Sequence, residues 1–186
     1  LIMEGEHFNA GIVISASHNP YHDNGIKLFD AVQCKLSPED ERRITEAFEM
    51  GDDAVAFVSG TLMHWPEASD AYQVLVLSQF PEGFLKNVHV VLDCAHGATH
   101  DIAPKLFRAL GARVTTIADA PNGTNINDHC GATHPELLRE AVLKFGADCG
   151  FAFDGDGDRI VAVNNKGDIK DGDDIVAFLL NHARYG

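Results

Sequence analysis

Three aspartates alternate with two glycines in the segment Asp154-Gly155-Asp156-Gly157-Asp158, directly after an apolar stretch. Glycine lacks a Cβ, so this segment can curl until the three carboxylates converge. Converging carboxylates repel one another unless a cation lies among them, and oxygen ligands favour a hard ion. The spacing therefore predicts a Mg²⁺ or Ca²⁺ site. The alternative is a solvated acidic turn, because Asp-Gly-Asp alone is common in turns.

The positions that follow exclude a calcium-binding EF-hand loop. Counted from Asp154, such a loop needs glycine at its sixth position and glutamate at its twelfth. Those positions hold Arg159 and Asn165, and the flanking segments are typical of strands. Arg159 either neutralises the acidic cluster or presents its guanidinium fork to a phosphate.

A second candidate site is the loop Ser15-Ala16-Ser17-His18-Asn19-Pro20, which follows an apolar strand. Folds of the α/β class place their chemistry beyond strand ends. Ser17 and His18 do not form a typical nucleophile and base, and the G-x-S-x-G elbow is missing. Near a cation and Arg159, however, the Ser17 hydroxyl can carry a phosphoryl group that completes the metal coordination. The alternative is that Ser17 is an ordinary turn residue.

Lys27 and the histidines are weaker candidates. Lys27 lies on the strand after the serine loop and is either a solvated charge or a partner for a phosphorylated serine. His18 adjoins the candidate site. Other histidines lack zinc-type spacing to cysteines and are interpreted as non-ligands; they are His96, His100, His129 and His134.

The composition limits the class of protein. The chain has 186 residues, a net charge of −14 and 45% apolar residues, which is ordinary for a globular protein of one or two domains. The negative charge disfavours nucleic-acid partners. No apolar run reaches the roughly 18 residues needed to cross a bilayer, and the N-terminus has no basic region of a secretory signal. The four cysteines form no C-x-x-C pair, so we expect reduced packing thiols in a cytoplasmic protein.

The elements that must position both loops alternate between strands and helices. Strands are expected over 11–15, 26–29, 88–93, 113–117, 149–153 and 159–163, and helices over 38–49, 67–80, 101–110, 135–145 and 175–183. Strand 11–15 is expected to be buried. Ser37 should cap the first helix, Thr133 or His134 the fourth, and Asp173 the last. The order from residue 88 onwards predicts an α/β fold with a mixed or parallel sheet and covering helices.

The two loops together resemble the α-D-phosphohexomutase superfamily. Its members carry a phosphorylated serine in a T/S-A-S-H-N-P loop and a metal in a D-G-D-G-D-R loop. Within it, residues 11–27, 93–99 and 121–127, with Cys130-Gly131-Ala132-Thr133 after them, are similar to the bacterial phosphoglucosamine mutase branch. The last stretch separates that branch from the phosphomannomutase/phosphoglucomutase branch. Residues 1–9 show no such match.

By motif, the resemblance implies that Ser17 carries the phosphoryl group and that Mg²⁺ is held by the phosphoserine and the three aspartates. Arg159 and His18 would contact the phosphoryl group, and Lys27 would assist proton transfer. The implied reaction interconverts glucosamine 6-phosphate and glucosamine 1-phosphate through a 1,6-bisphosphate, on the route to UDP-N-acetylglucosamine and cell-wall precursors. The alternatives are a phosphomannomutase/phosphoglucomutase and a plain divalent-metal-binding module.

The resemblance also implies a domain layout, since the superfamily's enzymes have four domains. Residues 1–70 would be the C-terminal part of domain 1, residues 71–170 domain 2, and residues 171–186 the start of domain 3. The sugar-recognition loop and the loop that grips the substrate phosphate would lie elsewhere. The chain by itself is therefore expected to be a poor mutase, and a homodimer is considered only for the full-length protein.

Overall fold

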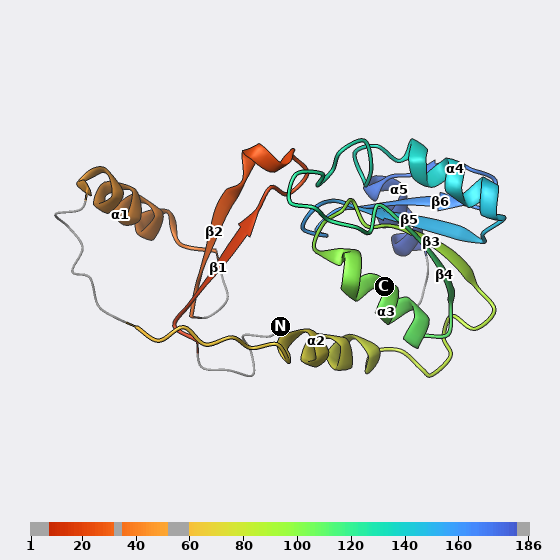
Figure 1. Ribbon diagram of the computed structural model, residues 1–186, viewed down its shortest axis with the longest axis horizontal. Coiled ribbons are helices and arrows are strands. Elements are labelled where there is room, and N and C mark those ends of the chain that lie inside the picture. The colour runs from red at the N-terminus through yellow and green to blue at the C-terminus, as the bar shows by residue number, and fades with distance from the viewer. Residues whose placement is uncertain (1–7, 32–34, 52–59, 182–186) are drawn as a thin grey trace. The chain divides into compact units, whose positions relative to one another are not determined.

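The computed structural model describes residues 8–31, 35–51 and 60–181. The chain divides into two compact units (Figure 1). The first consists of residues 1–14 and 26–72, and the second of residues 15–25 and 73–186. The loop of residues 15–20 (the serine loop) and the loop of residues 154–158 (the acidic loop) therefore belong to the same unit.

The first unit contains a two-stranded sheet and a helix. Strands β1 (Ala10–Ser15) and β2 (Gly25–Asp30) pair with each other, and α1 spans Pro38–Glu49. The Ser37 side chain caps α1 by accepting a hydrogen bond from the Asp40 amide at 3.1 Å, and Pro38 occupies the first turn. Both strands, the helix and its cap were predicted from the sequence.

The expected burial of β1 is wrong. Its apolar side chains are exposed, with 67% of Ile12, 42% of Val13 and 72% of Ile14 accessible to solvent. Among the residues that the structure describes, the sheet formed by β1 and β2 has two strands. An apolar run therefore predicts a strand here, but not the layer that would cover it.

The second unit is built on a five-stranded mixed sheet in the order β4-β3-β5-β6-β7. Its strands are β3 (His89–Asp93), β4 (Arg113–Ile117), β5 (Cys149–Phe153), β6 (Ile160–Asn164) and β7 (Ile169–Lys170). Strand β3 is parallel to β4 and β5, whereas β6 is antiparallel to both β5 and β7. This arrangement confirms the predicted α/β class. The two-residue strand β7 was not predicted.

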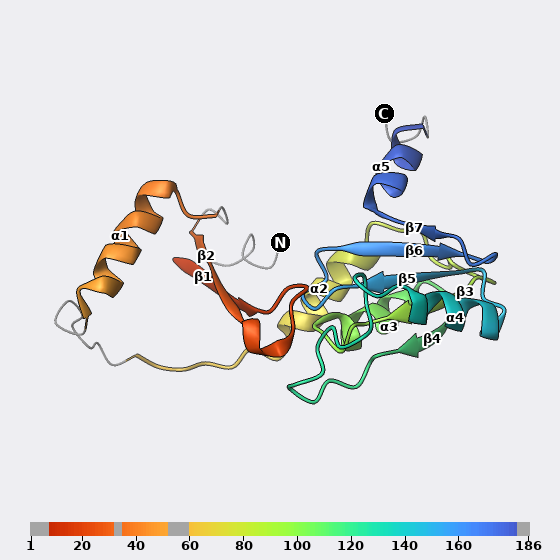
Figure 2. The same ribbon diagram turned by 90° about the horizontal axis from the view of Figure 1, so that it is seen from above.

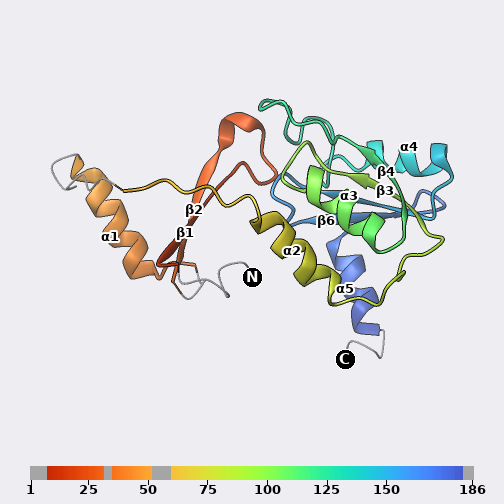
Figure 3. The same ribbon diagram turned by 60° about the horizontal axis from the view of Figure 1, so that its bottom comes forward.

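Four more helices and a short turn in the described part of the chain connect or cover these strands. They are α2 (Ala68–Leu77), α3 (Thr99–Ala109), α4 (Glu136–Phe145) and α5 (Gly172–Asn181), and a 3-10 turn spans Tyr21–Asp23. Helix α5 packs on β6 and β7 (Figures 2 and 3). None of the described helices is long and apolar enough to cross a membrane.

The core of the second unit has two layers, one on each face of the sheet (Figure 1). Alternate residues of β3 point to opposite faces. Val91 packs with Leu138 of α4 on one face, while Val90 and Leu92 pack with Ala103 of α3 on the other. Because β3 and β5 are parallel, the loops that leave their carboxyl ends start at the same edge of the sheet.

Two predicted helix caps are wrong. The N-cap of helix α4 is Pro135 rather than Thr133 or His134, and the helix has no side-chain cap because the proline ring offers no hydrogen-bond acceptor. At α5, Asp173 lies inside the first turn, and the Asp171 side chain accepts from the Asp174 amide at 3.0 Å instead. The expected end of the last helix at residue 183 lies outside the described residues.

Candidate functional site

The acidic loop curls as its spacing predicts. One carboxylate oxygen from each of Asp154, Asp156 and Asp158 lies within 4.8 Å of the others. Asp154 directly follows β5 and is fully buried, and its Oδ1 accepts from the Arg159 amide at 3.1 Å. Gly157 has a φ of +75° and donates its amide to the Asp154 carbonyl at 3.0 Å. The glycine therefore permits the reversal that brings the carboxylates together.

The electrostatics of the loop fit a cation. Burial raises the pKa of Asp154 most, the Arg159 amide opposes this shift, and the charges of Asp156 and Asp158 raise the pKa further. Asp154 Oδ2 is buried and accepts no hydrogen bond from the described residues. A buried carboxylate oxygen without a partner is unfavourable unless a cation compensates it. The oxygen-only donor set therefore fits a hard divalent ion such as Mg²⁺.

The serine loop is tied to the acidic loop through Ser15. The Ser15 hydroxyl donates to Asp156 Oδ2 at 2.9 Å and accepts from the Ser17 amide at 2.8 Å. Ser17 itself has a φ of +52°, which is uncommon for a residue with a side chain. One hydroxyl thus links a candidate metal ligand to the backbone of the candidate phosphate carrier.

The two loops also meet backbone to backbone. The Gly155 amide donates to the Ser17 carbonyl at 3.1 Å. A Cβ at position 155 would lie 2.4 Å from that carbonyl oxygen and 2.6 Å from Ile126 Cδ1. Only glycine therefore permits this approach, a second role for Gly155 beyond the loop flexibility inferred from the sequence.

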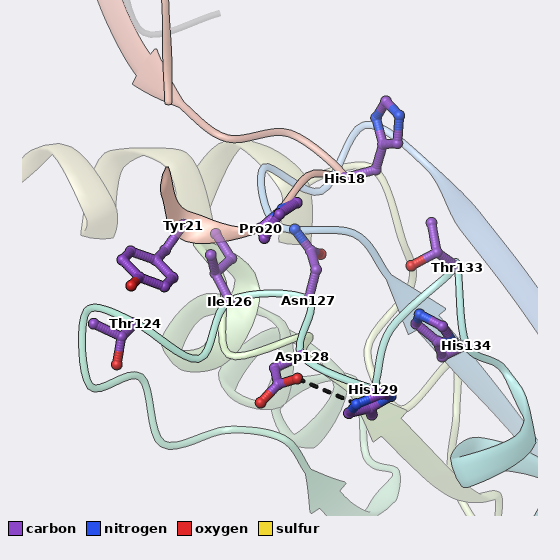
Figure 4. A pocket seen from close by; sticks show the side chains of 10 residues that line it. All are labelled: His18, Pro20, Tyr21, Thr124, Ile126, Asn127, Asp128, His129, Thr133 and His134. Carbon is purple, nitrogen blue, oxygen red and sulfur yellow. Dashed lines mark ion pairs between the residues drawn. The ribbon is translucent and has the colours of Figure 1, made fainter. Parts of the chain in front are cut away.

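His18 adjoins both Ser17 and a pocket in the same unit. His18 Nδ1 lies 3.5 Å from Ser17 Oγ. The pocket has a volume of about 360 Å³, and Figure 4 shows the ten side chains that line it. Two of them, His129 and His134, have ring centroids 5.7 Å apart, and His129 Nε2 lies 3.7 Å from Asp128.

The other two predicted site residues are Arg159 and Lys27. Arg159 contributes its backbone amide to the acidic loop, and its side chain is exposed. Lys27 lies on β2 and so belongs to the first unit. The phosphate-contacting role of Arg159 and the proton-transfer role of Lys27 stay predictions, as do the roles of Ser17 and His18.

Two residues near the site were missed by the sequence analysis. Asn127 donates its side-chain amide to the carbonyls of Ser17 and Asn19 at 2.8 Å each. Asp93, fully buried at the end of β3, accepts from the Ala95 amide at 3.0 Å and from the Gly131 amide at 2.9 Å. Burial raises the pKa of Asp93, and these amides oppose the shift. Their only sequence signal was membership of the stretches 93–99 and 121–127.

The cysteines behave as packing residues where the structure describes them. Cys94 and Cys130 are buried, and burial raises the pKa of each thiol to about 12. Burial also raises the pKa of Cys149. Thiols so far from ionisation are poor nucleophiles and metal ligands. Cys34 lies outside the described residues.

Comparisons with known proteins agree with the class that the fold and the two loops define. The phosphoglucomutase/phosphomannomutase family matches twice, through its α/β/α domain I at residues 2–54 and its α/β/α domain II at residues 76–167. The domain I match includes residues 2–9, so the expectation that residues 1–9 lie outside the resemblance is wrong. The chain belongs to this family of phosphohexomutases.

Individual relatives indicate a particular branch of the family. The chain is 49% identical over 178 residues to a phosphoglucosamine mutase of Syntrophus aciditrophicus, with 93% of the chain and 40% of the relative covered. It is 51% identical over 168 residues to that of Cellvibrio japonicus, with 90% and 38% covered. The chain therefore spans about 40% of the length of these curated relatives. A solved phosphoglucomutase/phosphomannomutase family protein of Burkholderia thailandensis matches with a TM-score of 0.72 and 27% identity over 86% of this chain and 34% of that one.

Proposed function

We propose that the chain forms the phosphoserine and metal-binding part of a mutase that interconverts glucosamine 6-phosphate and glucosamine 1-phosphate. The observation that carries the proposal is the direct contact between the two loops, in which Gly155 donates to the Ser17 carbonyl. A serine on a loop bonded to the loop of the three converging carboxylates suits a phosphate that is both covalently carried and bound to a cation. The similarity to named phosphoglucosamine mutases supports the choice of sugar.

In the proposed reaction, Ser17 Oγ carries the phosphoryl group. Attack by a sugar hydroxyl forms a new P–O bond to the sugar and breaks the bond to Ser17 Oγ, which gives a 1,6-bisphosphate. Attack by Ser17 Oγ on the other phosphate of that bisphosphate restores the phosphoserine and releases the isomeric monophosphate. Lys27 would accept or return the hydroxyl proton. Phosphoryl transfer depends on positioning and charge, which the fixed loops supply.

The acidic loop would hold Mg²⁺ through its three aspartates. The ion would supply positive charge that offsets the negative charge on the phosphoryl oxygens. Arg159 would add a guanidinium and His18 an imidazole on the same group. We propose the domain layout of residues 1–70, 71–170 and 171–186 given above, and a place in the cytoplasmic supply of cell-wall precursors.

Turnover needs more than these loops, because the phosphoserine must be shielded from water while the bisphosphate reorients. The chain spans about 40% of its relatives. We therefore expect negligible mutase turnover from these 186 residues alone, and assays of turnover belong to the full-length protein.

Phosphate incorporation tests the proposal directly. Full-length protein is incubated with Mg²⁺ and glucosamine 1,6-bisphosphate labelled in phosphate, and the label is located by peptide mass spectrometry. We expect one phosphate, on Ser17, and its loss in Ser17→Ala. Ser78→Ala, at an exposed serine of the same unit whose hydroxyl bonds locally to the Leu75 carbonyl and the Gln79 side-chain amide, should keep the label. Label at another residue, or none in the wild type, would exclude the phosphoserine mechanism and leave a plain metal-binding module.

Turnover with three substrates tests the choice of sugar. The full-length enzyme should convert glucosamine 6-phosphate with a higher kcat/KM than glucose 6-phosphate or mannose 6-phosphate. A preference for either of the last two would assign the chain to a phosphomannomutase/phosphoglucomutase instead.

A further inference from the structure

We propose that Asn127 is a positioning residue that holds the Ser17 loop in its phosphate-accepting geometry. The inference rests on the proposed function, because the benefit of holding Ser17 lies in phosphoryl transfer. Asn127 lies in the segment 121–127, far from Ser17 in sequence but in the same unit. Its side chain is visible in Figure 4 beneath the serine loop.

The Asn127 amide uses both of its N–H groups on the serine loop. Nδ2 donates to the carbonyls of Ser17 and Asn19, each at 2.8 Å. Because both partners are carbonyl acceptors, only the orientation with the NH₂ group towards them is favourable. Asn127 is 8% exposed, so water competes little for these bonds. The side chain thus binds the loop through the carbonyls on either side of His18.

The backbone of Asn127 is anchored to the sheet. Its amide donates to the Ala95 carbonyl at 2.9 Å, and the Ala95 amide in turn donates to the buried Asp93 carboxylate. Asn127 has a φ of +57°, a conformation that asparagine adopts more readily than most residues. A chain of hydrogen bonds therefore runs from the end of β3 through Ala95 and Asn127 to Ser17.

Ser17 needs such support because its own backbone is unfavourable. A residue with a side chain at a φ of +52° is strained, and this conformation persists only when its surroundings over-determine it. The Ser17 carbonyl receives two donors, the Gly155 amide and Asn127 Nδ2. Loss of the side-chain donor leaves the direction of Ser17 Oγ less well defined relative to the carboxylates.

One variant separates the effect of the Asn127 side-chain amide from that of the Asn127 backbone. Asn127→Gly tolerates the positive φ and keeps the backbone bond to Ala95, so it deletes only the side chain. Asn127→Asp is the second variant, since it keeps size while replacing the donors by an acceptor. The matched control is Asn125→Ala, because Asn125 bonds only within its own loop, to Ala120 and Asn122.

The first measurement is the single-turnover rate of phosphate transfer from glucosamine 1,6-bisphosphate to Ser17 in the full-length protein. A misplacement of about 1 Å can slow such a step roughly a hundredfold. We expect both Asn127 variants to lose about tenfold to a hundredfold in the rate, with the bisphosphate concentration at half-maximal rate changed less than about threefold. Asn125→Ala should stay within about twofold of the wild type.

The second measurement does not depend on activity. Because the Gly155 amide is protected by the Ser17 carbonyl, its hydrogen exchange reports whether the serine loop is in place. Exchange at Gly155 should accelerate about tenfold in Asn127→Gly and stay unchanged in Asn125→Ala. A wild-type transfer rate in Asn127→Gly would overturn the inference, as would unchanged Gly155 exchange. If the wild type itself accepts no phosphate, the proposed function fails, while the Gly155 exchange still decides whether Asn127 holds the loop.

Discussion

The acidic loop and the serine loop both follow apolar strands, but those strands differ in burial. Strand β5 lies inside a sheet covered on both faces, and the loop that it carries begins with the fully buried Asp154. Strand β1 exposes 72% of Ile14, and the loop after it is held by hydrogen bonds from Gly155 and Asn127. The first loop is placed by the strand beneath it, and the second by polar contacts made by the loop itself.

This difference predicts which substitutions damage which loop. Substitutions in the sheet core should destabilise the acidic loop by lowering the free energy of unfolding of the whole unit. Substitutions at the polar contacts should loosen the serine loop with little change in stability. Apolar positions on β1 should matter least within this chain.

The largest effect is expected at Asp154, where a cation would be bound. A unit charge about 4 Å from a cation is worth about 4 kcal/mol at an effective dielectric constant of about 20, and a carboxylate ligand lies closer to its ion than that. Removing the Asp154 charge should therefore lower the affinity at least roughly a thousandfold. Isothermal titration calorimetry with Mg²⁺ should show this loss in Asp154→Asn. Asp173→Asn, an exposed acid in α5 with the same change of charge, should bind as the wild type does. Unchanged Mg²⁺ affinity in Asp154→Asn would exclude the three-carboxylate site.

The same variant should have the opposite effect on the metal-free protein. Burial raises the pKa of Asp154 in the folded state. Between the unfolded and the raised folded pKa the native state binds more protons, so stability falls as pH rises through that window. Asp154→Asn removes this penalty. At pH 7 without metal, thermal denaturation should show the variant at least as stable as the wild type.

A substitution in the core should have the next largest effect. Leu138 of α4 is fully buried against Val91, Ala152 and Val163, beneath the strands that carry the acidic loop. Leu138→Ala should lower the free energy of unfolding by about 2–5 kcal/mol through lost burial and the cavity left behind. Urea denaturation followed by circular dichroism measures this change. A loss below about 1 kcal/mol would mean that the core is not the main support of the sheet.

The comparison also explains what could be predicted from the sequence. Strands 113–117 and 149–153 were predicted to the residue, because short runs rich in β-branched or aromatic residues are local signals. The convergence of the three carboxylates followed from their spacing alone. Features that depend on neighbouring residues in the sequence could therefore be predicted.

The missed features depend on contacts between distant segments. The exposure of β1 depends on which layers lie over it, and periodicity does not encode that. The bonds from Asn127 to Ser17 and Asn19 join residues more than a hundred positions apart. The cap of α4 was misplaced because its N-cap position falls on Pro135, which has no side-chain acceptor. The cap of α5 was misplaced because Asp171, and not Asp173, accepts from the first turn of that helix.

A smaller effect is expected at Ser15, the hydroxyl that joins Asp156 to the Ser17 amide. Ser15→Ala should lose about 1 kcal/mol or less of unfolding free energy, the net value of a typical hydrogen bond. Phosphate transfer to Ser17 in the full-length protein should fall by more than that stability change suggests, because the bond orients the carrier. Ser15→Thr keeps the hydroxyl and should restore the rate. Equal rates in Ser15→Ala and Ser15→Thr would remove the hydroxyl from the positioning of Ser17.

The smallest effect is expected on β1. Ile14 is 72% exposed, so its replacement by threonine removes little buried apolar surface and keeps a β-branched side chain suited to a strand. In the 186-residue chain, Ile14→Thr should change the unfolding free energy by less than about 0.5 kcal/mol, as exposed substitutions usually do. Urea denaturation beside Leu138→Ala makes the contrast direct. A loss above about 1 kcal/mol at Ile14 would mean that β1 is covered in solution, and the serine loop would then be supported by its strand as the acidic loop is.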